Sequence, residues 1–428
     1  MVETLDTETT EAAGEGSSRA LMINMILALV AGLVLILVIL DGAFLVKQYQ
    51  APWRKYYNQR FDDPRIRVAT HGLLASSMLN LQPWRVVLDY QDSTVFWLYA
   101  DTSRALRDTD MFARRITFDQ GAFLQYAILG AERLGYQPRV DLFPEGEYGR
   151  LGDWAAIDTL PVARVQLNPA ERQSPGLYLA MFEVLHPRVP FKDQAVPTRM
   201  AEFFNRQLNN PQFQIQLIEG GEDVALMREI LQLAIETDLG LARIVRESNL
   251  FRTTEYMKNQ LRDGITIDSF DYSRLGKFLW QVGHSIIPMR SQDAADKLAG
   301  ALSQAVTSAP AYLMISSQHN SRIDQIEAGM LFARLQLVAT AIGVAILPVT
   351  QAVRDYPEMF EPYVDLHTEF ALRGYRVQMV AGIGEPARRV DPEPRRFIMD
   401  IIEEEPPPKV LEQKKKRSRP EGSQIRPG

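Results

Sequence analysis

The first absence in this chain of 428 residues is cysteine, of which it has none. Disulfides, zinc–thiolate sites, iron–sulfur clusters and cysteine nucleophiles are therefore excluded. Histidine is scarce, and no two histidines stand four residues apart with a glutamate between them, the spacing of one common zinc site. The five histidines are His71, His186, His284, His319 and His367. We expect no metal, and the sequence identifies no catalytic acid, base or nucleophile.

An excess of positive charge is also missing. The formal net charge is -6 at pH 7 and the isoelectric point is near 5.6. Dedicated nucleic-acid binders usually carry a strongly basic face, so we expect no nucleic-acid partner. Hydrophobic residues make up 46% and charged residues 23% of the chain, as in ordinary globular proteins. The length suffices for one large core or two smaller ones.

Long hydrophobic runs are absent with one exception, "ALMINMILALVAGLVLILVIL" at residues 20–40, in which Asn24 is the only polar side chain. At about 1.5 Å per residue, such a helix crosses a hydrocarbon core of about 30 Å. A signal peptide is the alternative, but it would have a basic start and a small-residue cleavage site. Residues 1–19 instead hold five acids and one base. We predict an acidic tail over 1–19 and a transmembrane helix over 20–46.

Charges on the two sides of this run predict its orientation. Lys47, Arg54, Lys55 and Arg60 follow it, against the single acid Asp41. Positive charge stays on the cytoplasmic side of a membrane. We therefore expect a single-pass membrane protein with its N-terminus outside and its large domain in the cytoplasm.

Polar stretches border the expected domain on both sides. Residues 47–61 form a connector in which Trp53, Tyr56 and Tyr57 are expected at the lipid headgroups. Residues 401–428 are charged and proline-rich, which predicts a disordered tail. Its "KKKRSR" run either contacts anionic lipid or is simply solvated.

Between these ends, the order strand, connector, long buried helix, glycine, strand occurs twice. The first pass comprises 94–101, 121–136 and 138–143, and the second comprises 311–318, 329–344 and 345–349. Further helices are predicted after Pro197, over 222–247 and over 251–262.

Glycine spacing marks both passes. Gly121 and Gly135 are 14 residues apart, as are Gly329 and Gly343, and the second glycine of each pair stands where a helix favours a left-handed residue. We predict an α+β domain over 62–400 with two pseudo-symmetric halves, about 62–172 and 173–400, which form a pseudo-dimer within one chain. The alternative is coincidence, since helices often end in glycine.

The polar run "SSMLNLQPWR" at 76–85 follows neither the alternation of a strand nor the three-to-four residue period of a helix. It gathers hydrogen-bonding groups and ends in a proline and a flat aromatic side chain. The run either binds a ligand or only forms a turn of the chain.

Four segments together resemble the nitroreductase-like flavoproteins. "HGLLASSMLNLQPWRVVLD" (71–89) is similar to that family's helix, "APSxxNxQPWRF" turn and strand. "HPRVPFKDQAVP" (186–197) is similar to its basic entry to a helix, and "AGIGEPARR" (381–389) to its terminal strand and turn. With "EYMKNQLRDG" (255–264), the order looks closest to the internally duplicated, Acg-like branch.

The resemblance implies FMN, bound where the two halves meet. It implies as flavin-binding residues Ser76, Ser77, Asn80, Gln82, Arg188, Arg388 and Arg389. Amides and hydroxyls suit the ring edge and ribityl chain, and arginines suit the phosphate. It further implies NADH or NADPH as reductant and a small organic molecule as electron acceptor.

The sequence also departs from the family pattern. Ser76 replaces the usual proline, Leu79 precedes the asparagine, and only Arg188 remains of the basic residues at the helix entry. Fewer cations weaken phosphate binding, so two alternatives stay open. One is a flavin-holding protein without significant turnover, and the other is a degenerate core that binds a protein partner. The serines would then only cap a turn, and Arg188 would make an ion pair.

Overall fold

The protein is described by a computed structural model that covers residues 3–42, 45–149, 152–174, 176–184, 188–247 and 250–404. Its longer helices are α1 (Glu3–Asp41), α2 (Pro64–Gly72), α3 (Arg114–Leu134), α6 (Gly221–Gly240), α9 (Arg274–Ile286), α10 (Ser291–Ser308), α11 (Arg322–Ala341) and α12 (Phe360–Glu369). The shorter ones are α4 (Trp154–Thr159), α5 (Met200–Asn205), α7 (Ala242–Glu247) and α8 (Glu255–Leu261).

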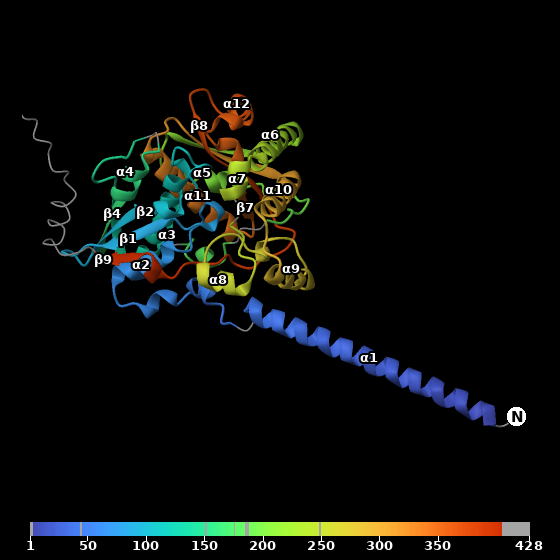
Figure 1. The fold of residues 1–428 in the computed structure, drawn as a ribbon. Coiled ribbons are helices and arrows are strands. Elements are labelled where there is room, and N and C mark those ends of the chain that lie inside the picture. The colour runs from blue at the N-terminus through green and yellow to red at the C-terminus, as the bar shows by residue number, and fades with distance from the viewer. Residues whose placement is uncertain are drawn as a thin grey trace, which may run out of the picture.

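Helix α1 projects from the rest of the protein (Figure 1). Within it, Leu21–Ile39 is long and apolar enough to cross a membrane, a test that an N-terminal signal sequence also passes. The predicted acidic tail is part of this helix, which begins at Glu3.

The first sheet contains β1 (Trp84–Leu88), β2 (Val95–Ala100), β3 (Tyr136–Leu142), β4 (Ala163–Pro169) and β9 (Ile402–Glu404). Its order is β3-β4-β2-β1-β9, and every pair except β1 with β9 is antiparallel. Helix α3 connects β2 to β3, and its apolar side packs on this sheet together with α2.

The second sheet contains β5 (Phe213–Ile218), β6 (Ala311–Ser317), β7 (Ala345–Pro348) and β8 (Arg376–Gly384). Its order is β5-β6-β8-β7, all antiparallel, with α11 between β6 and β7. Reversed, this order is β7-β8-β6-β5, which corresponds strand for strand to β3-β4-β2-β1. The two units therefore share one topology around one long helix each.

The ends of the two long helices follow from local sequence. The Asp110 carboxylate accepts hydrogen bonds from the backbone amides of Arg115 (2.9 Å) and Ile116 (2.8 Å) in the first turn of α3. Ser321 and Asp324 form a reciprocal capping box at the start of α11. Gly135 and Gly343 adopt left-handed backbone after the helices, with φ of 93° and 81°.

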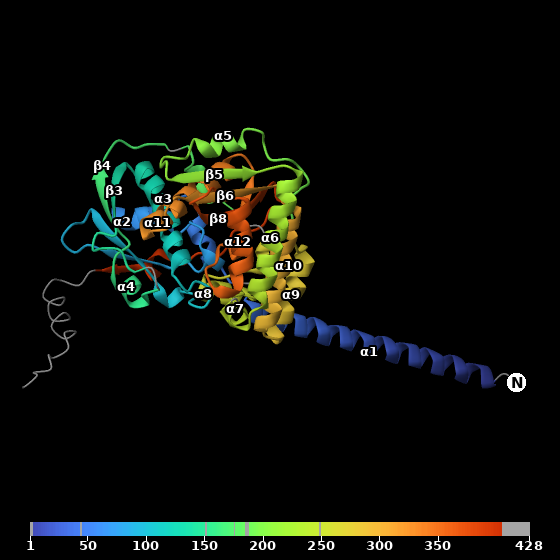
Figure 2. The same cartoon turned by 90° about the horizontal axis from the view of Figure 1, so that it is seen from above.

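Helices α3 and α11 lie side by side in the middle of the protein (Figures 1 and 2) and touch at two glycines. A Cβ on Gly121 would lie 1.9 Å from the carbonyl oxygen of Ile326, and one on Gly329 would lie 2.0 Å from that of Phe118. Each glycine thus faces the residue three positions before the other. The contact is the same in both directions, as in an isologous interface.

The C-terminal segment returns from the second unit to the first. After β8, the chain passes along the domain and forms β9, which pairs in parallel with β1. This strand corrects the prediction of a disordered tail from residue 401, because Ile402–Glu404 complete the edge of the first sheet. Residues 405–428, including the basic run, lie outside the described residues.

The connector also differs from expectation. Tyr49, Trp53 and Tyr57 are buried in the domain, and the Trp53 indole donates to the Glu393 carbonyl at 2.8 Å. Only Tyr56, of the three aromatic residues expected at lipid headgroups, is exposed. The prediction was wrong for Trp53 and Tyr57, because apolar neighbours from distant segments cover them.

The strands of both passes are confirmed to within one or two residues. Helices α3 and α11 begin seven residues before the predicted starts, 121 and 329. Helix 222–247 is divided into α6 and α7 at Leu241, and helix 251–262 is confirmed in part as α8. The helix predicted after Pro197 begins at Met200.

The glycine contact gives a stability prediction. Gly121→Ala or Gly329→Ala forces α3 and α11 apart and should lower the free energy of unfolding by about 3 kcal/mol. Gly300→Ala in α10 is the matched control, because a Cβ there meets nothing within 4 Å and should be neutral or stabilising by up to about 1 kcal/mol. Thermal unfolding of the full chain in detergent measures both. Equal effects at Gly121 and Gly300 would contradict the close crossing.

Candidate functional site

The loop between α2 and β1 carries an unusual backbone. Leu79, Asn80 and Gln82 have positive φ of 46°, 57° and 52°. Left-handed backbone costs a non-glycine residue about 1 kcal/mol or more, and such strain gathers at functional sites. Surrounding contacts must therefore hold this loop in place.

The Asn80 side chain is one of those contacts. It is buried, and its amide nitrogen donates to the carbonyls of Gly264 (3.1 Å) and Pro394 (3.0 Å). Its amide oxygen accepts from the Arg395 guanidinium at 2.7 Å. The amide that was predicted to meet a flavin is engaged inside the protein.

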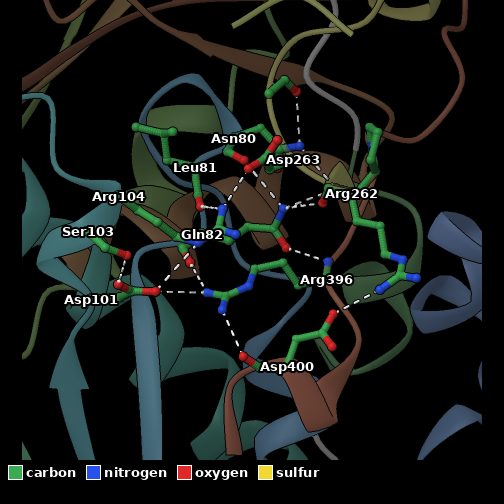
Figure 3. A network of polar contacts seen from close by, with 12 residues as sticks. Asn80, Leu81, Gln82, Asp101, Ser103, Arg104, Arg262, Asp263, Arg396 and Asp400 are labelled. Atoms are coloured by element: carbon green, nitrogen blue, oxygen red, sulfur yellow. Dashed lines mark hydrogen bonds and ion pairs between the residues drawn. The ribbon is translucent and has the colours of Figure 1, made fainter. Parts of the chain in front are cut away.

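Gln82 is held in the same way (Figure 3). Its amide nitrogen donates to the Arg262 carbonyl at 2.9 Å, and its amide oxygen accepts from the Arg396 backbone amide at 2.8 Å. Burial lowers the pKa of Arg396 to about 10. Asn80 and Gln82 thus fix the strained loop to the C-terminal segment 394–396.

Three of the predicted flavin-binding residues come together. Ser76, Ser77 and Arg188 line one cavity of about 70 Å³ with Arg115 and Gln351. Ser76 donates to the Gln336 side chain of α11 at 2.5 Å, and the Ser77 hydroxyl accepts from the Gln82 backbone amide at 2.8 Å. The cavity therefore has walls from both units, since Arg115 is on α3 and Gln351 follows β7.

Arg188 enters this cavity as half of a buried ion pair. Its guanidinium donates to Glu393 at 2.6 Å and to the Ser269 hydroxyl at 2.9 Å. A phosphate at this arginine would share it with Glu393 or displace that carboxylate. His186, two residues earlier, lies outside the described residues.

Arg388 and Arg389 lie elsewhere. Both line a surface hollow of about 320 Å³ that shares no described lining residue with the Ser76 cavity. Arg388 pairs with Asp271 at 3.2 Å, and the exposed Arg389 pairs with Glu183 at 3.3 Å. The structure does not bring them to the cavity of Ser76, Ser77 and Arg188.

Several polar groups at the cavity were missed by the sequence reasoning. Arg115 Nε and Gln351 Oε1 at the cavity, and Gln336 Nε2 beside Ser76, are buried without a hydrogen-bond partner among the described residues, although Arg115 Nε lies 3.5 Å from the Asp119 carboxylate. Unsatisfied buried groups cost about 1–3 kcal/mol each, so such a cluster favours a polar ligand. The only signal in the sequence was the Arg115–Asp119 spacing of four residues near the start of a helix.

Asp119 lies behind this cavity and holds the loop. Its carboxylate accepts from the Met78 backbone amide at 2.8 Å and lies 3.5 Å from the Arg115 Nε. Burial raises the pKa of Asp119 to about 7, partly offset by the charge of Arg115. The carboxyl group therefore changes protonation near neutral pH.

The cavity has neighbouring hollows that share wall residues with it. Met78, Arg115, Thr350 and Arg354 also line a second cavity of about 40 Å³. That cavity shares Arg114, Arg354 and Tyr356, among others, with an open hollow of about 700 Å³. Two small inner cavities thus lie beside a wide open hollow.

Comparison with known proteins finds no matching family model. Two proteins named "Putative NAD(P)H nitroreductase", from the CDC 1551 and H37Rv strains of Mycobacterium tuberculosis, are each 24% identical over 356 residues. The match covers 78% of this chain and 90% of each relative. The chain is similar to nitroreductase-like proteins. This similarity supports the relationship that the four motifs predict.

Two solved structures also match in part. The FMN- and NADPH-dependent nitroreductase NfnB from Sphigopyxis sp. strain HMH is 16% identical, with a TM-score of 0.33, and covers 54% of this chain and 99% of its own. A nitroreductase with bound FMN from Desulfitobacterium hafniense is 11% identical, with a TM-score of 0.32, and covers 52% and 94%.

The Asp119 carboxyl group predicts a pH dependence. Between about pH 4 and 7 the folded protein keeps a proton that the unfolded chain releases, so the free energy of unfolding falls as pH rises through this window. Asp119→Asn has no such proton. We expect the variant to gain roughly 2–4 kcal/mol relative to the native chain between pH 4 and pH 8.

Denaturant unfolding of the full chain in detergent at the two pH values measures this difference. Asp296→Asn, at an exposed position in α10, is the control and should show no pH-dependent gain. A gain that is independent of pH would contradict the buried, proton-holding carboxyl group.

Proposed function

We propose that this chain is a membrane-anchored, FMN-dependent oxidoreductase of nitroreductase type. It takes electrons from NADH or NADPH and passes them to a small organic acceptor. The single observation that carries the proposal is the cavity between the two units, where Ser76, Ser77 and Arg188 meet the buried Gln351 Oε1, which has no hydrogen-bond partner among the described residues.

The residues of the cavity fit FMN by type. Arg115 and Arg188 offer cations for the phosphate, and Ser76 and Ser77 offer hydroxyls for the ribityl chain. The free Gln351 Oε1 suits an N–H donor of the ring edge. Asn80 and Gln82 would act indirectly, because they hold in place the loop that carries the serines. Arg388 and Arg389 stand outside this proposal.

FMN, when bound, supplies the acceptance and release of electron pairs, so this chain needs no catalytic acid or base of its own. The protein's part is to bind, to orient and to exclude water. Leu79, Leu298, Leu302 and Leu347 give the cavity an apolar side suited to a flat ring. The hollow of about 700 Å³ is the entry we propose for reductant and acceptor.

The second candidate is a flavin-holding protein without significant turnover, which the loss of basic residues around Arg188 favours. Ligand pockets typically measure about 300–1,000 Å³, whereas the inner cavities measure about 70 and 40 Å³. Flavin entry therefore requires the walls to separate. The Arg188–Glu393 pair adds to the cost of entry. A protein-interaction module without flavin is the third candidate.

We further propose that the two units are copies of one ancestral unit, as in the Acg-like branch. The matching strand order and the reciprocal glycine contact support this. Membrane anchoring through α1, with the domain cytoplasmic, is supported by Leu21–Ile39 and by the basic residues that follow.

Flavin reduction separates the candidates. The full chain in detergent is loaded with FMN, freed of excess, and mixed with NADH or NADPH without oxygen. Loss of the flavin absorbance near 450 nm supports the oxidoreductase. Retained flavin that is not bleached supports the flavin-holding protein. If no flavin is retained, both the oxidoreductase and the flavin-holding protein are contradicted.

Gln351→Leu tests the site itself. The variant loses the free amide oxygen, so we expect FMN affinity to fall by about tenfold, the effect of one good hydrogen bond. Gln91→Leu, in an exposed turn, is the matched control. Equal flavin affinity in the two variants would contradict an FMN site in the Ser76 cavity.

A further inference from the structure

Helix α9 exposes its apolar side. Leu275, Phe278, Leu279, Val282 and Ile286 recur at helical spacing, and no residue of this helix is buried. Leu275, Leu279 and Ile286 are 67%, 58% and 59% exposed, and Ile287 after the helix is 69% exposed. A surface helix of a soluble domain normally turns this stripe inward. A continuous exposed stripe of this kind marks an interaction surface.

The polar side of α9 holds it to the domain. The Lys277 ammonium donates to the Asp268 carbonyl at 3.1 Å, and the Gln281 amide donates to Glu255 at 3.3 Å. Trp280 adds an apolar contact to the core beside these hydrogen bonds, whereas the leucines and Ile286 of the stripe face outward. This arrangement is fixed by specific contacts and is not a loose segment.

The exposed stripe lies next to the end of the proposed membrane span. Helix α1 contacts α9 and α8 near its C-terminal end, as both views show (Figures 1 and 2). There, Asp41 accepts from the Glu255 backbone amide at 3.4 Å, and Gly42 packs against Tyr256, which is 54% exposed. The apolar span ends at Ile39. If α1 crosses a bilayer, α9 lies at the level of its surface.

We propose that α9 is a membrane-surface helix, whose apolar side inserts into the boundary between lipid headgroups and acyl chains beside α1. The inference rests on the anchoring part of the proposed function, and not on the flavin. Charge contributes little, because Arg290 is paired with Asp293 and Lys277 with Asp268 and Asp391, which leaves Arg274 as the only lysine or arginine of α9 without an ion pair among the described residues. Insertion should therefore need no anionic lipid. Its consequence is a domain held in one orientation, with α8 and α9 against the membrane.

The chain lacks cysteine, so single cysteines can be labelled without background. Leu279→Cys in α9 and Leu372→Cys are each spin-labelled in the full chain, in nanodiscs of phosphatidylcholine. Leu372 is the matched control, because it is 48% exposed and follows α12, far from α1 (Figure 1). We expect the label at 279 to be at least fivefold less accessible than the label at 372 to a water-soluble nickel chelate, and more accessible to oxygen.

Three outcomes would overturn the inference. Equal chelate accessibility at 279 and 372 would show that α9 faces water. Spin–spin broadening at 279 that disappears on dilution with unlabelled chain would show that a second copy covers the stripe. A chain that does not enter nanodiscs would contradict the proposed membrane anchor as well. Failure of flavin reduction would leave all of these readouts unaffected.

A double variant gives an independent readout. Leu275→Asp with Leu279→Asp should leave the chain in the nanodisc through α1, while an otherwise identical label at 372 gains rotational mobility. Unchanged mobility at 372 would overturn the role of α9 in orienting the domain. Flavin content should stay the same in this variant, because α9 contributes no residue to the Ser76 cavity.

Discussion

The structure depends on the place where α3 and α11 cross. Gly121 and Gly329 let the backbones touch, so that each helix packs on its own sheet and on the other helix. The start of α3, with Arg115 and Asp119, is thereby brought to the loops that precede β1 and follow β7. The cavity that we propose for FMN exists only where these segments meet. A side chain at either glycine would separate the walls as well as the helices.

The C-terminal segment is the second constraint. Glu393 neutralises Arg188, Pro394 and Arg396 hold the amides of Asn80 and Gln82, and β9 extends the first sheet. Burial lowers the pKa of Arg395 to about 10, and its guanidinium lies over the Trp53 ring. The strained loop 79–82 is therefore held by residues more than 300 positions away. This nonlocal support explains why the loop keeps an unfavourable backbone.

Much of the fold could be predicted, because strands and helices with apolar stripes have a local signal. The repeated glycine spacing correctly marked the long helices. The polar run at 76–85 supplies four cavity residues, of which Ser76 and Ser77 were predicted. The first turns of α3 and α11 were missed because buried Arg114, Asp119, Arg322 and Asp324 break the apolar period. Arg114 and Arg322 donate to carbonyls of distant segments, and Asp324 caps its own helix, and periodicity detects neither kind of contact. Asn80 and Gln82 were assigned to a ligand, whereas their amides bind backbone groups and the Arg395 guanidinium. The outward direction of the apolar stripe on α9 could not be predicted either, because an apolar stripe in a sequence does not indicate whether it faces the core or the outside.

The central claim is that this chain forms one flavin site from two units. The loop before β5 that corresponds to 76–82 lines a different hollow, of about 190 Å³, in which Glu327 accepts from Asn210 at 2.7 Å. Glu327 and Arg334 balance each other in that hollow, whereas in the Ser76 cavity three arginines face only Glu393 among the described lining residues, so a phosphate is favoured in the Ser76 cavity alone. The most direct test is the FMN-to-protein ratio of the full chain, measured by equilibrium titration in detergent. We expect a ratio of one FMN per chain. A ratio of zero would contradict the site, and a ratio of two would contradict the difference between the halves.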